Sequence, residues 1–176
     1  YLFDEWENDH LFIKDMNLML DCVIEEYIEK GSKISGFEKA IKFAREHRSI
    51  GLGVIAFTSF LQKKGIAFGE LASFAVNKRI FEKLHDESLW ASQWMAKHWG
   101  EPLMLEGYGL RNTTRLAQAP TKSTSFIMGG AYMNYSEGIE PLKSNYNSKK
   151  LAKIQTEVKN HELVKLLESK KLNTRE

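Results

Sequence analysis

Apolar residues recur every three or four positions through most of the first 100 residues, which is the spacing of amphipathic helices. The pattern predicts four helices, over residues 9–30, 37–46, 50–64 and 68–99. Gly31, Gly65 and Gly100 end three of them, since glycine adopts the backbone conformation of a helix C-terminus without steric cost. The third helix is apolar on most sides and is therefore expected to be buried.

The longest helix should direct one row of side chains into the core. We expect Leu84 to lie in that row and its neighbour Lys83 to face solvent, where a substitution would be tolerated. The residues expected to point inward are Leu71, Phe74, Ala75, Ile80, Leu84, Leu89, Ala91 and Met95.

After Pro102 the helical periodicity fades, and glycine, threonine, serine, asparagine and tyrosine become more frequent. Two strands, a short helix or turn, and a last helix are predicted there, over 113–119, 144–151, 125–128 and 162–169 respectively. The two strands are each other's only visible partners, and a bare pair of strands is marginal in water. We therefore predict a mostly helical α/β chain that is poorly soluble or partly molten in isolation.

Composition places the chain among globular proteins, as one domain or a part of one, with 176 residues, 43% hydrophobic and 27% charged. Its net charge of +2 is too small to indicate nucleic-acid binding. No apolar run approaches the length of a membrane span. The acidic start has no signal-peptide layout and no initiator methionine, which favours a fragment or a processed product.

The single cysteine, Cys22, lies within the first helical pattern and can form no internal disulfide. We expect a small buried hydrophobe, with a redox role as the alternative. A chain without disulfides fits a reducing compartment, so we predict a cytoplasmic location. The five histidines are far apart in sequence and form no metal-binding motif.

A cluster of hydroxyl residues follows Pro120, in the order Thr121, Lys122, Ser123, Thr124 and Ser125. A strand that ends in hydroxyls and open backbone N–H groups can receive a phosphate, to which a lysine adds charge and a following helix N-terminus its dipole. The alternative is a Ser/Thr loop that only caps the helix beginning near Ser125.

Residues 51–56 match the glycine pattern of dinucleotide-binding folds. That pattern requires a hydrophobic strand before it, but the preceding residues are charged and read as a helix. The better interpretation is close helix packing, in which Gly51 and Gly53 let a neighbouring backbone approach.

Two further groups could carry function. Trp90, Trp94 and Trp99 are best explained by core or subunit packing, because a base-stacking platform would need a basic groove. Glu137 and Glu140 could form an acid–base pair near the hydroxyl cluster. We favour a structural role in which Glu140 pairs with Arg111 or Arg115, two of the nearby arginines.

Several motifs in a fixed order resemble the large (catalytic, alpha) subunit of ribonucleotide reductase, in a bacterial or phage-like form. Around the hydroxyl cluster these are GLRN, A-x-AP, T-x-S-x-S-x-I-x-G and GIEP. The resemblance extends back to R-x-I-G-L-G-V and to Gly65-Ile66, and forward through Ser144-Asn145-Tyr146 to 160–167. It covers nearly the whole chain and indicates a segment from the C-terminal half of that subunit.

The resemblance implies a fragment of the family's ten-stranded alpha/beta barrel, with 1–100 as its helical part and 101–176 as strand, phosphate loop and last helix of the same domain. The family reduces ribonucleotides to deoxyribonucleotides by a thiyl-radical mechanism. Its radical cysteine and reducing cysteine pair lie upstream, and its relay tyrosines lie downstream. No catalytic residue is therefore expected in this segment, which alone should be inactive.

By the same resemblance, Thr121, Lys122, Ser123 and Thr124 hold the substrate phosphates. No cofactor or metal is expected on the segment, whereas the complete enzyme needs a radical generator and a dithiol reductant. Expected partners are the ribonucleotide, the rest of the catalytic subunit, a radical-generating small subunit in class I enzymes, and a second copy of the complete subunit. Neither a membrane nor nucleic acid is an expected partner.

Two other functions make different demands on the sequence. A non-catalytic helical interaction module would show no protection of the hydroxyl cluster by phosphate or nucleotide. A phosphotransferase would need a P-loop lysine motif and an acidic metal ligand, and the sequence has neither.

Overall fold

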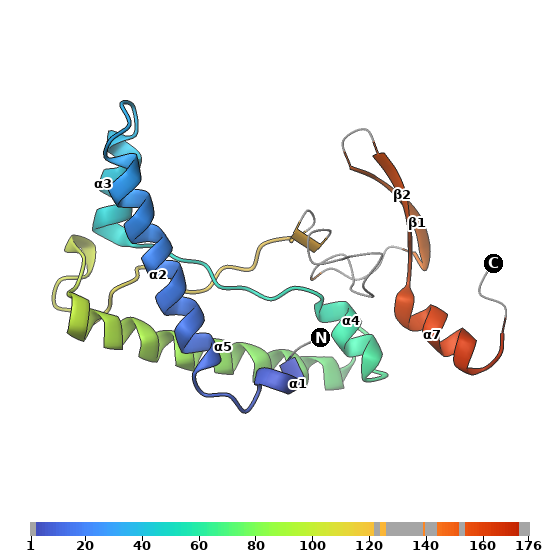
Figure 1. Cartoon of the computed structure of the whole chain (residues 1–176). Coiled ribbons are helices and arrows are strands. Elements are labelled where there is room, and N and C mark those ends of the chain that lie inside the picture. The colour runs from blue at the N-terminus through green and yellow to red at the C-terminus, as the bar shows by residue number, and fades with distance from the viewer. Residues whose placement is uncertain (1–2, 122–123, 126–138, 140–143, 152–153, 173–176) are drawn as a thin grey trace. The chain divides into compact units, whose positions relative to one another are not determined.

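The chain's architecture comes from a computed structural model, shown in Figure 1. The structure describes residues 3–121, 124–125, 139, 144–151 and 154–172. Its contacts divide the chain into two compact units. The helical unit comprises Leu2–Gly53 and Asn77–Gln118, and the hairpin unit comprises Tyr1, Val54–Val76 and Ala119–Glu176.

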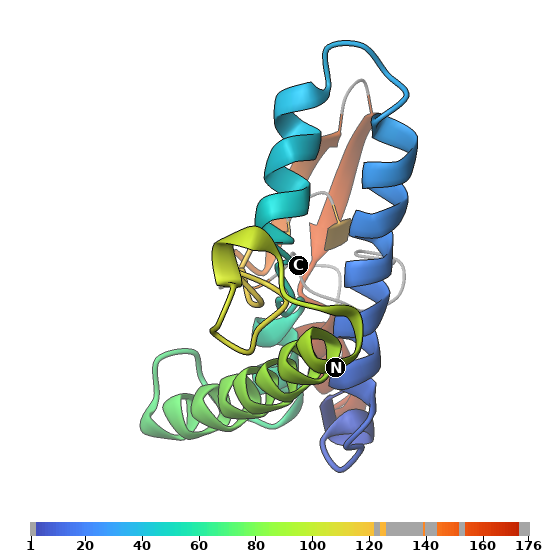
Figure 2. The ribbon, with the colours of Figure 1, turned by 90° about the vertical axis from the view of Figure 1, so that its left-hand side faces the viewer.

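Four helices and a 3-10 turn build the helical unit: α1 (Phe3–Trp6), α2 (Phe12–Gly31), α3 (Glu38–His47), most of α5 (Leu71–Trp99) and η1 (Leu103–Leu105). Helices α2 and α3 lie side by side as a pair (Figure 2).

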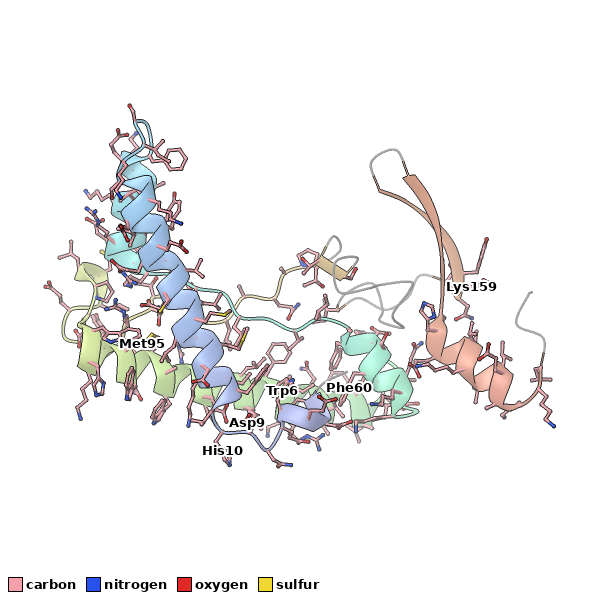
Figure 3. All side chains as sticks on the ribbon, viewed as in Figure 1. Trp6, Asp9, His10, Phe60, Met95 and Lys159 are labelled. Atoms are coloured by element: carbon pink, nitrogen blue, oxygen red, sulfur yellow. The ribbon has the colours of Figure 1, made fainter. Side chains whose placement is uncertain are left out.

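The turn before α2 contains Asp9 and His10, which Figure 3 labels beside Trp6. The Asp9 carboxylate accepts the backbone N–H groups of Leu11 and Phe12 at 2.8 and 3.2 Å. These bonds satisfy amides near the helix start that have no partner within the helix, and they hold the pKa of Asp9 below its usual value.

Aliphatic side chains form the core of the helical unit, each at most 5% exposed: Ile13, Ile28, Ile41, Ile80, Leu84, Ala91 and Met95. Polar residues share this interior, because Asn17, Asp21, Ser88 and Ser92 are also at most 1% exposed. Since burying a polar group without a partner is costly, hydrogen bonds must compensate for such positions.

Two extended segments pair in parallel inside the helical unit. The N–H of Ile50 donates to the carbonyl of Thr114, and the N–H of Leu52 to that of Arg115, both at 3.0 Å. The N–H of Ala117 returns a bond to Leu52 at 3.1 Å. Gly51 and Gly53 permit this approach, because a Cβ on Gly53 would lie 2.5 Å from the Ala117 carbonyl oxygen.

The hairpin unit contains α4 (Phe57–Lys63), β1 (Tyr146–Leu151), β2 (Ile154–Lys159) and α7 (His161–Ser169). Strands β1 and β2 are antiparallel, with Tyr146 opposite Lys159 and Leu151 opposite Ile154. Phe60 of α4 and Lys159 of β2 are labelled in Figure 3.

The N-terminus of α7 is joined to the hairpin through Asn160. Its side-chain oxygen accepts the N–H of Leu163 at 3.2 Å, as an N-cap does. Its amide nitrogen donates to the side chain of Asn145 at 3.1 Å, and its backbone N–H donates to the Asn145 carbonyl at 2.7 Å.

Four of the predicted helices are found, with ends shifted by a few residues: α2, α3, α5 and α7. The prediction of a helix over 50–64 was wrong in its first half, where the chain is extended and only α4 is helical. Residues 51–56 are almost uniformly apolar or glycine, so they carry no periodicity that separates a strand from a helix. Gly51 and Gly53 do admit a neighbouring backbone, although it belongs to an extended segment.

The predicted strand over 113–119 is an extended segment with one isolated bridge, Leu116 to Leu52, in the described part of the chain. The predicted strand over 144–151 is confirmed as β1, but its partner is β2. Most of the predicted turn over 125–128 lies outside the described residues.

Exposure corrects several expectations from the sequence. Cys22 is exposed, so it is not a buried hydrophobe. Leu84 is buried as predicted, but Leu71 and Phe74 are 87% and 62% exposed. Lys83 does not face open solvent, because its ammonium donates to Glu87 at 2.7 Å and to the Asp9 carbonyl at 2.9 Å.

Candidate phosphate-binding loop and a buried ion cluster

The candidate phosphate loop begins at Thr121, whose φ of 55° is in the left-handed region. A β-branched residue is rarely found there, and such conformations concentrate at functional sites. The Thr121 hydroxyl donates to the Pro120 carbonyl at 2.8 Å, and the Ser125 N–H donates to the Thr121 carbonyl at 2.9 Å. This bond spans four positions, as in one turn of an α-helix, and residues 124–125 are helical.

The side chains of this loop differ in their exposure. Thr124 is exposed, whereas Ser125 is only 2% exposed. Lys122 and Ser123 lie outside the described residues. The Thr124 hydroxyl is thus available to a ligand, whereas the Ser125 side chain belongs to the interior.

A buried ion cluster lies in the helical unit and centres on the Asp21 carboxylate of α2. Its Oδ1 accepts from Arg48 Nε and Asn112 Nδ2, both at 3.0 Å. Its Oδ2 accepts from Arg48 Nη2 at 2.9 Å and from Arg111 Nε at 2.8 Å. A carboxylate offers about four acceptor positions, so Asp21 is saturated. The fourth charged member is Glu25, which accepts from Arg48 Nη1 at 2.7 Å.

The charges of this cluster compensate one another. Burial by itself would raise the pKa of Asp21, but hydrogen bonds and charge from Arg48 and Arg111 outweigh it, so the pKa lies below its usual value. Burial would likewise lower the pKa of Arg48, and the bonds to Asp21 and Glu25 raise it instead. Asp21 and Arg48 therefore stabilise each other's ionised forms.

Arg111 and Asn112 connect the cluster to α5 and to the backbone of Arg48. Arg111 Nη1 donates to the carbonyls of Trp99 and Gly100, both at 2.9 Å, which caps the end of α5. The Asn112 amide donates to the Arg48 carbonyl at 2.9 Å. The Ser92 hydroxyl accepts the backbone N–H groups of both residues at 3.1 and 3.0 Å.

Sequence reasoning missed this cluster. It noted Arg111 as part of the GLRN motif and as one possible partner of Glu140, which lies outside the described residues, but it did not foresee the pair with Asp21. The available signal was the spacing of Asn17 and Asp21, which lie four and eight positions after the buried Ile13 on the same helix face.

The remaining candidate groups have structural contacts. Trp94 packs edge-to-face on Trp99 at 5.6 Å, and the Lys14 ammonium lies 4.3 Å from the centre of the Trp90 ring. Burial lowers the pKa of Arg115, whose guanidinium donates to the His85 carbonyl at 3.4 Å. Glu137 and Glu140 lie outside the described residues. Within the described part of the chain, no group of His, Cys, Asp and Glu could hold a metal ion, and no helix is long and apolar enough to cross a membrane.

Comparison with known proteins places this arrangement in a family. The family model described as "Ribonucleotide reductase, barrel domain" matches residues 5–105 and 103–176. The chain belongs to the ribonucleotide reductase family. The resemblance seen in the sequence motifs is confirmed.

Relatives of this ribonucleotide reductase segment include viral, archaeal and bacterial proteins. The large subunit of ribonucleoside-diphosphate reductase from Invertebrate iridescent virus 6 is 38% identical over 143 residues, 81% of this chain and 14% of the viral protein. The vitamin B12-dependent ribonucleoside-diphosphate reductase of Thermoplasma acidophilum is 32% identical over 112 residues, 60% of this chain and 14% of that protein.

A solved structure agrees with the fold of this reductase segment. The alpha subunit of the class Id ribonucleotide reductase of Actinobacillus ureae matches 99% of the chain with a TM-score of 0.85 and 41% identity. The chain spans 31% of that subunit's length.

Proposed function

We propose that this chain is the part of a ribonucleotide reductase catalytic subunit that binds the phosphates of the substrate. The complete enzyme would reduce ribonucleotides to deoxyribonucleotides by a thiyl-radical mechanism and so serve DNA replication in the cytoplasm. The segment would form part of the family's ten-stranded barrel, with 1–100 as its helical part and 101–176 carrying the phosphate loop.

The observation that carries the proposal is the loop after Pro120. It has the motif T-x-S-x-S in a chain of this family, a left-handed residue at Thr121, and an exposed hydroxyl at Thr124. Thr121, Lys122, Ser123 and Thr124 would face the phosphates, with backbone N–H groups donating beside the hydroxyls.

The chemistry at the ribose would be supplied from outside this segment. Neither a cofactor nor a catalytic cysteine is assigned to it, and alone it should be inactive. The complete enzyme would need a radical generator, a dithiol reductant and the rest of the catalytic subunit. A radical-generating small subunit and a homodimer of complete subunits complete the proposed assembly.

The test is kinetic and uses the assembled enzyme. Ser123→Ala and Thr124→Ala should each weaken substrate binding roughly tenfold to hundredfold, because a hydrogen bond to a charged group contributes about 1.5–3 kcal/mol. The loss should appear in KM, since the phosphates bind similarly in the ground and transition states. Thr121→Pro, which deletes a backbone donor, should be worse, and replacing Lys122 should matter less if backbone amides dominate.

Ser169→Ala provides the control, because this exposed hydroxyl lies at the end of α7, outside the loop, and donates to the Leu166 carbonyl. Nucleotide KM values within about twofold of wild type for all the loop variants, with folding intact, would show that the loop binds no phosphate.

A further inference from the structure

The segment that leads to the phosphate loop, residues 109–118, is fixed at several separate places. The side chains of Arg111 and Asn112 donate to Asp21 at 2.8 and 3.0 Å. Their backbone N–H groups donate to Ser92. Farther along, the carbonyls of Thr114 and Arg115 accept from the extended segment that starts at Arg48. Only Ala119 and Pro120 separate its last residue from Thr121.

Asp21 joins the two extended segments. Its carboxylate holds Arg48 by two hydrogen bonds at the start of one segment, and Arg111 and Asn112 at the start of the other. The Asn112 amide also donates to the Arg48 carbonyl, so the two starts are linked directly as well. The position of both segments thus depends on one side chain that is 1% exposed.

The chemistry at this position requires a carboxylate. All four side-chain bonds to Asp21 are donated to it, by two guanidinium groups and one amide. An asparagine would turn its own NH₂ group toward at least one of these donors, and a donor facing a donor forms no hydrogen bond. It would also remove the carboxylate that pairs with Arg111, whereas Arg48 would keep its pair with Glu25.

We propose that Asp21 is a positioning residue for substrate binding, which fixes the segment over 109–118 and thereby the backbone from which the phosphate loop starts. The inference rests on the proposed function of that loop. Asp21 touches neither the substrate nor the reacting atoms in this scheme. A small displacement of positioning groups is enough to lower activity strongly, since misplacement by about 1 Å can cost about a hundredfold.

The experiment compares three variants in the assembled catalytic subunit. Asp21→Asn removes the carboxylate. Asn112→Ala removes only the amide bond to Asp21 and Arg48, and it tests the proposal if Asp21→Asn fails to fold. Ile28→Ala is the matched control, because Ile28 lies on the same helix, is 5% exposed and contributes only packing. For each variant we would measure the nucleotide KM, kcat and the inhibition constant of inorganic pyrophosphate as a competitive inhibitor. Thermal unfolding of each variant reports its stability.

We expect Asp21→Asn to raise the nucleotide KM and the pyrophosphate inhibition constant together by about tenfold, and Asn112→Ala to raise both by a smaller factor, with kcat within about twofold of wild type. Ile28→Ala should lower the unfolding temperature without moving either constant. The proposal is overturned if Asn112→Ala, and any folded Asp21→Asn, give the same constants as Ile28→Ala.

The loop variants distinguish a failure of the positioning role from a failure of the proposed function. If Thr124→Ala raises the KM and the Asp21 and Asn112 variants do not, the loop binds phosphate and the positioning role is wrong. If neither set changes the KM, the proposed function fails, and the positioning role fails with it.

Discussion

Asp21 shows how a single residue can contradict the usual pattern of a helix face. It lies among the buried positions of α2, where periodicity alone would place an apolar residue. Its burial is possible because Arg48 and Arg111 both pair with it. Replacing one partner of such a buried group leaves an uncompensated charge, which typically costs about 3–5 kcal/mol.

The pH dependence of Asp21 can be predicted from the direction of its pKa. The folded-state pKa lies below the ordinary value of 3.8, so the carboxylate stabilises the fold fully above pH 3.8 and loses this effect as the pH falls through the folded-state pKa. Asp21→Asn should therefore increase hydrogen exchange in α2 by a constant factor between about pH 5 and 7. Below pH 3.8 the difference from wild type should shrink.

Glu26→Gln serves as the comparison for that measurement, because Glu26 forms an exposed pair with Lys30 one turn away. Its exchange should match wild type throughout, since exposed ion pairs contribute little. A gap between wild type and Asp21→Asn that widens toward acid would contradict the assigned sign.

Among the elements, the sequence was most informative where one face of a helix is apolar and the other is charged. Helices α2, α3, α5 and α7 were predictable for this reason. The extended segment after Arg48 was not, because nearly every side chain from Leu52 to Ala56 is apolar. Of the hairpin, the first strand was predicted and the second was missed, although Ile154, Thr156 and Val158 of the second strand alternate in the way typical of a strand.

Of the two candidate groups, one could be found from the sequence and the other could not. The hydroxyl cluster could be found because its chemistry is contiguous in sequence. The ion cluster could not, because Asp21 and Asn112 are 91 positions apart and only the tertiary fold brings them together.

Helix α5 allows a direct test of its buried face. Leu84→Asp should unfold the helical unit, because Leu84 is 2% exposed and the new carboxylate would have no partner. Lys78→Asp is the matched substitution, on a side chain that is 74% exposed. Far-UV circular dichroism during heating should show a large loss of stability for the first variant only. Equal losses would mean that the buried face of α5 is assigned wrongly.

The two glycines that meet a neighbour at 2.5 Å should differ in their response to alanine. A Cβ on Gly53 would meet the Ala117 carbonyl oxygen, which is backbone and is held by pairing. A Cβ on Gly31 would meet the Cδ1 of Ile41, the flexible end of a side chain.

Gly53→Ala should therefore lower the unfolding temperature, whereas Gly31→Ala should be nearly neutral, helped by the better helix propensity of alanine. Differential scanning calorimetry of the two variants is the measurement. A neutral Gly53→Ala would show that the paired segments can separate without loss.

At the scale of the whole molecule, the chain spans 31% of the reductase subunit that it resembles in structure. Its surface includes an apolar row on α2, where Met19, Val23 and Tyr27 recur every four residues and are 40–53% exposed. Contiguous apolar surface of this kind marks contact sites or a tendency to aggregate.

The isolated chain should consequently bind the dye ANS and aggregate at moderate concentration, and it should show no reductase activity. Addition of the remaining part of the subunit should suppress dye binding and restore activity. A monomeric isolated chain with a sharp melt and no dye binding would contradict this expectation.

The pairing of Ile50 with Thr114 also has a consequence for synthesis on the ribosome. The two residues are 64 positions apart, so the first extended segment emerges well before its partner. At about 5–20 residues per second, the delay is roughly 3–13 s. An apolar segment then waits unpaired while α5, whose hydrogen bonds are local, can form at once. During that interval the nascent chain offers a binding site to chaperones, and slower translation of the codons after α5 would lengthen its exposure.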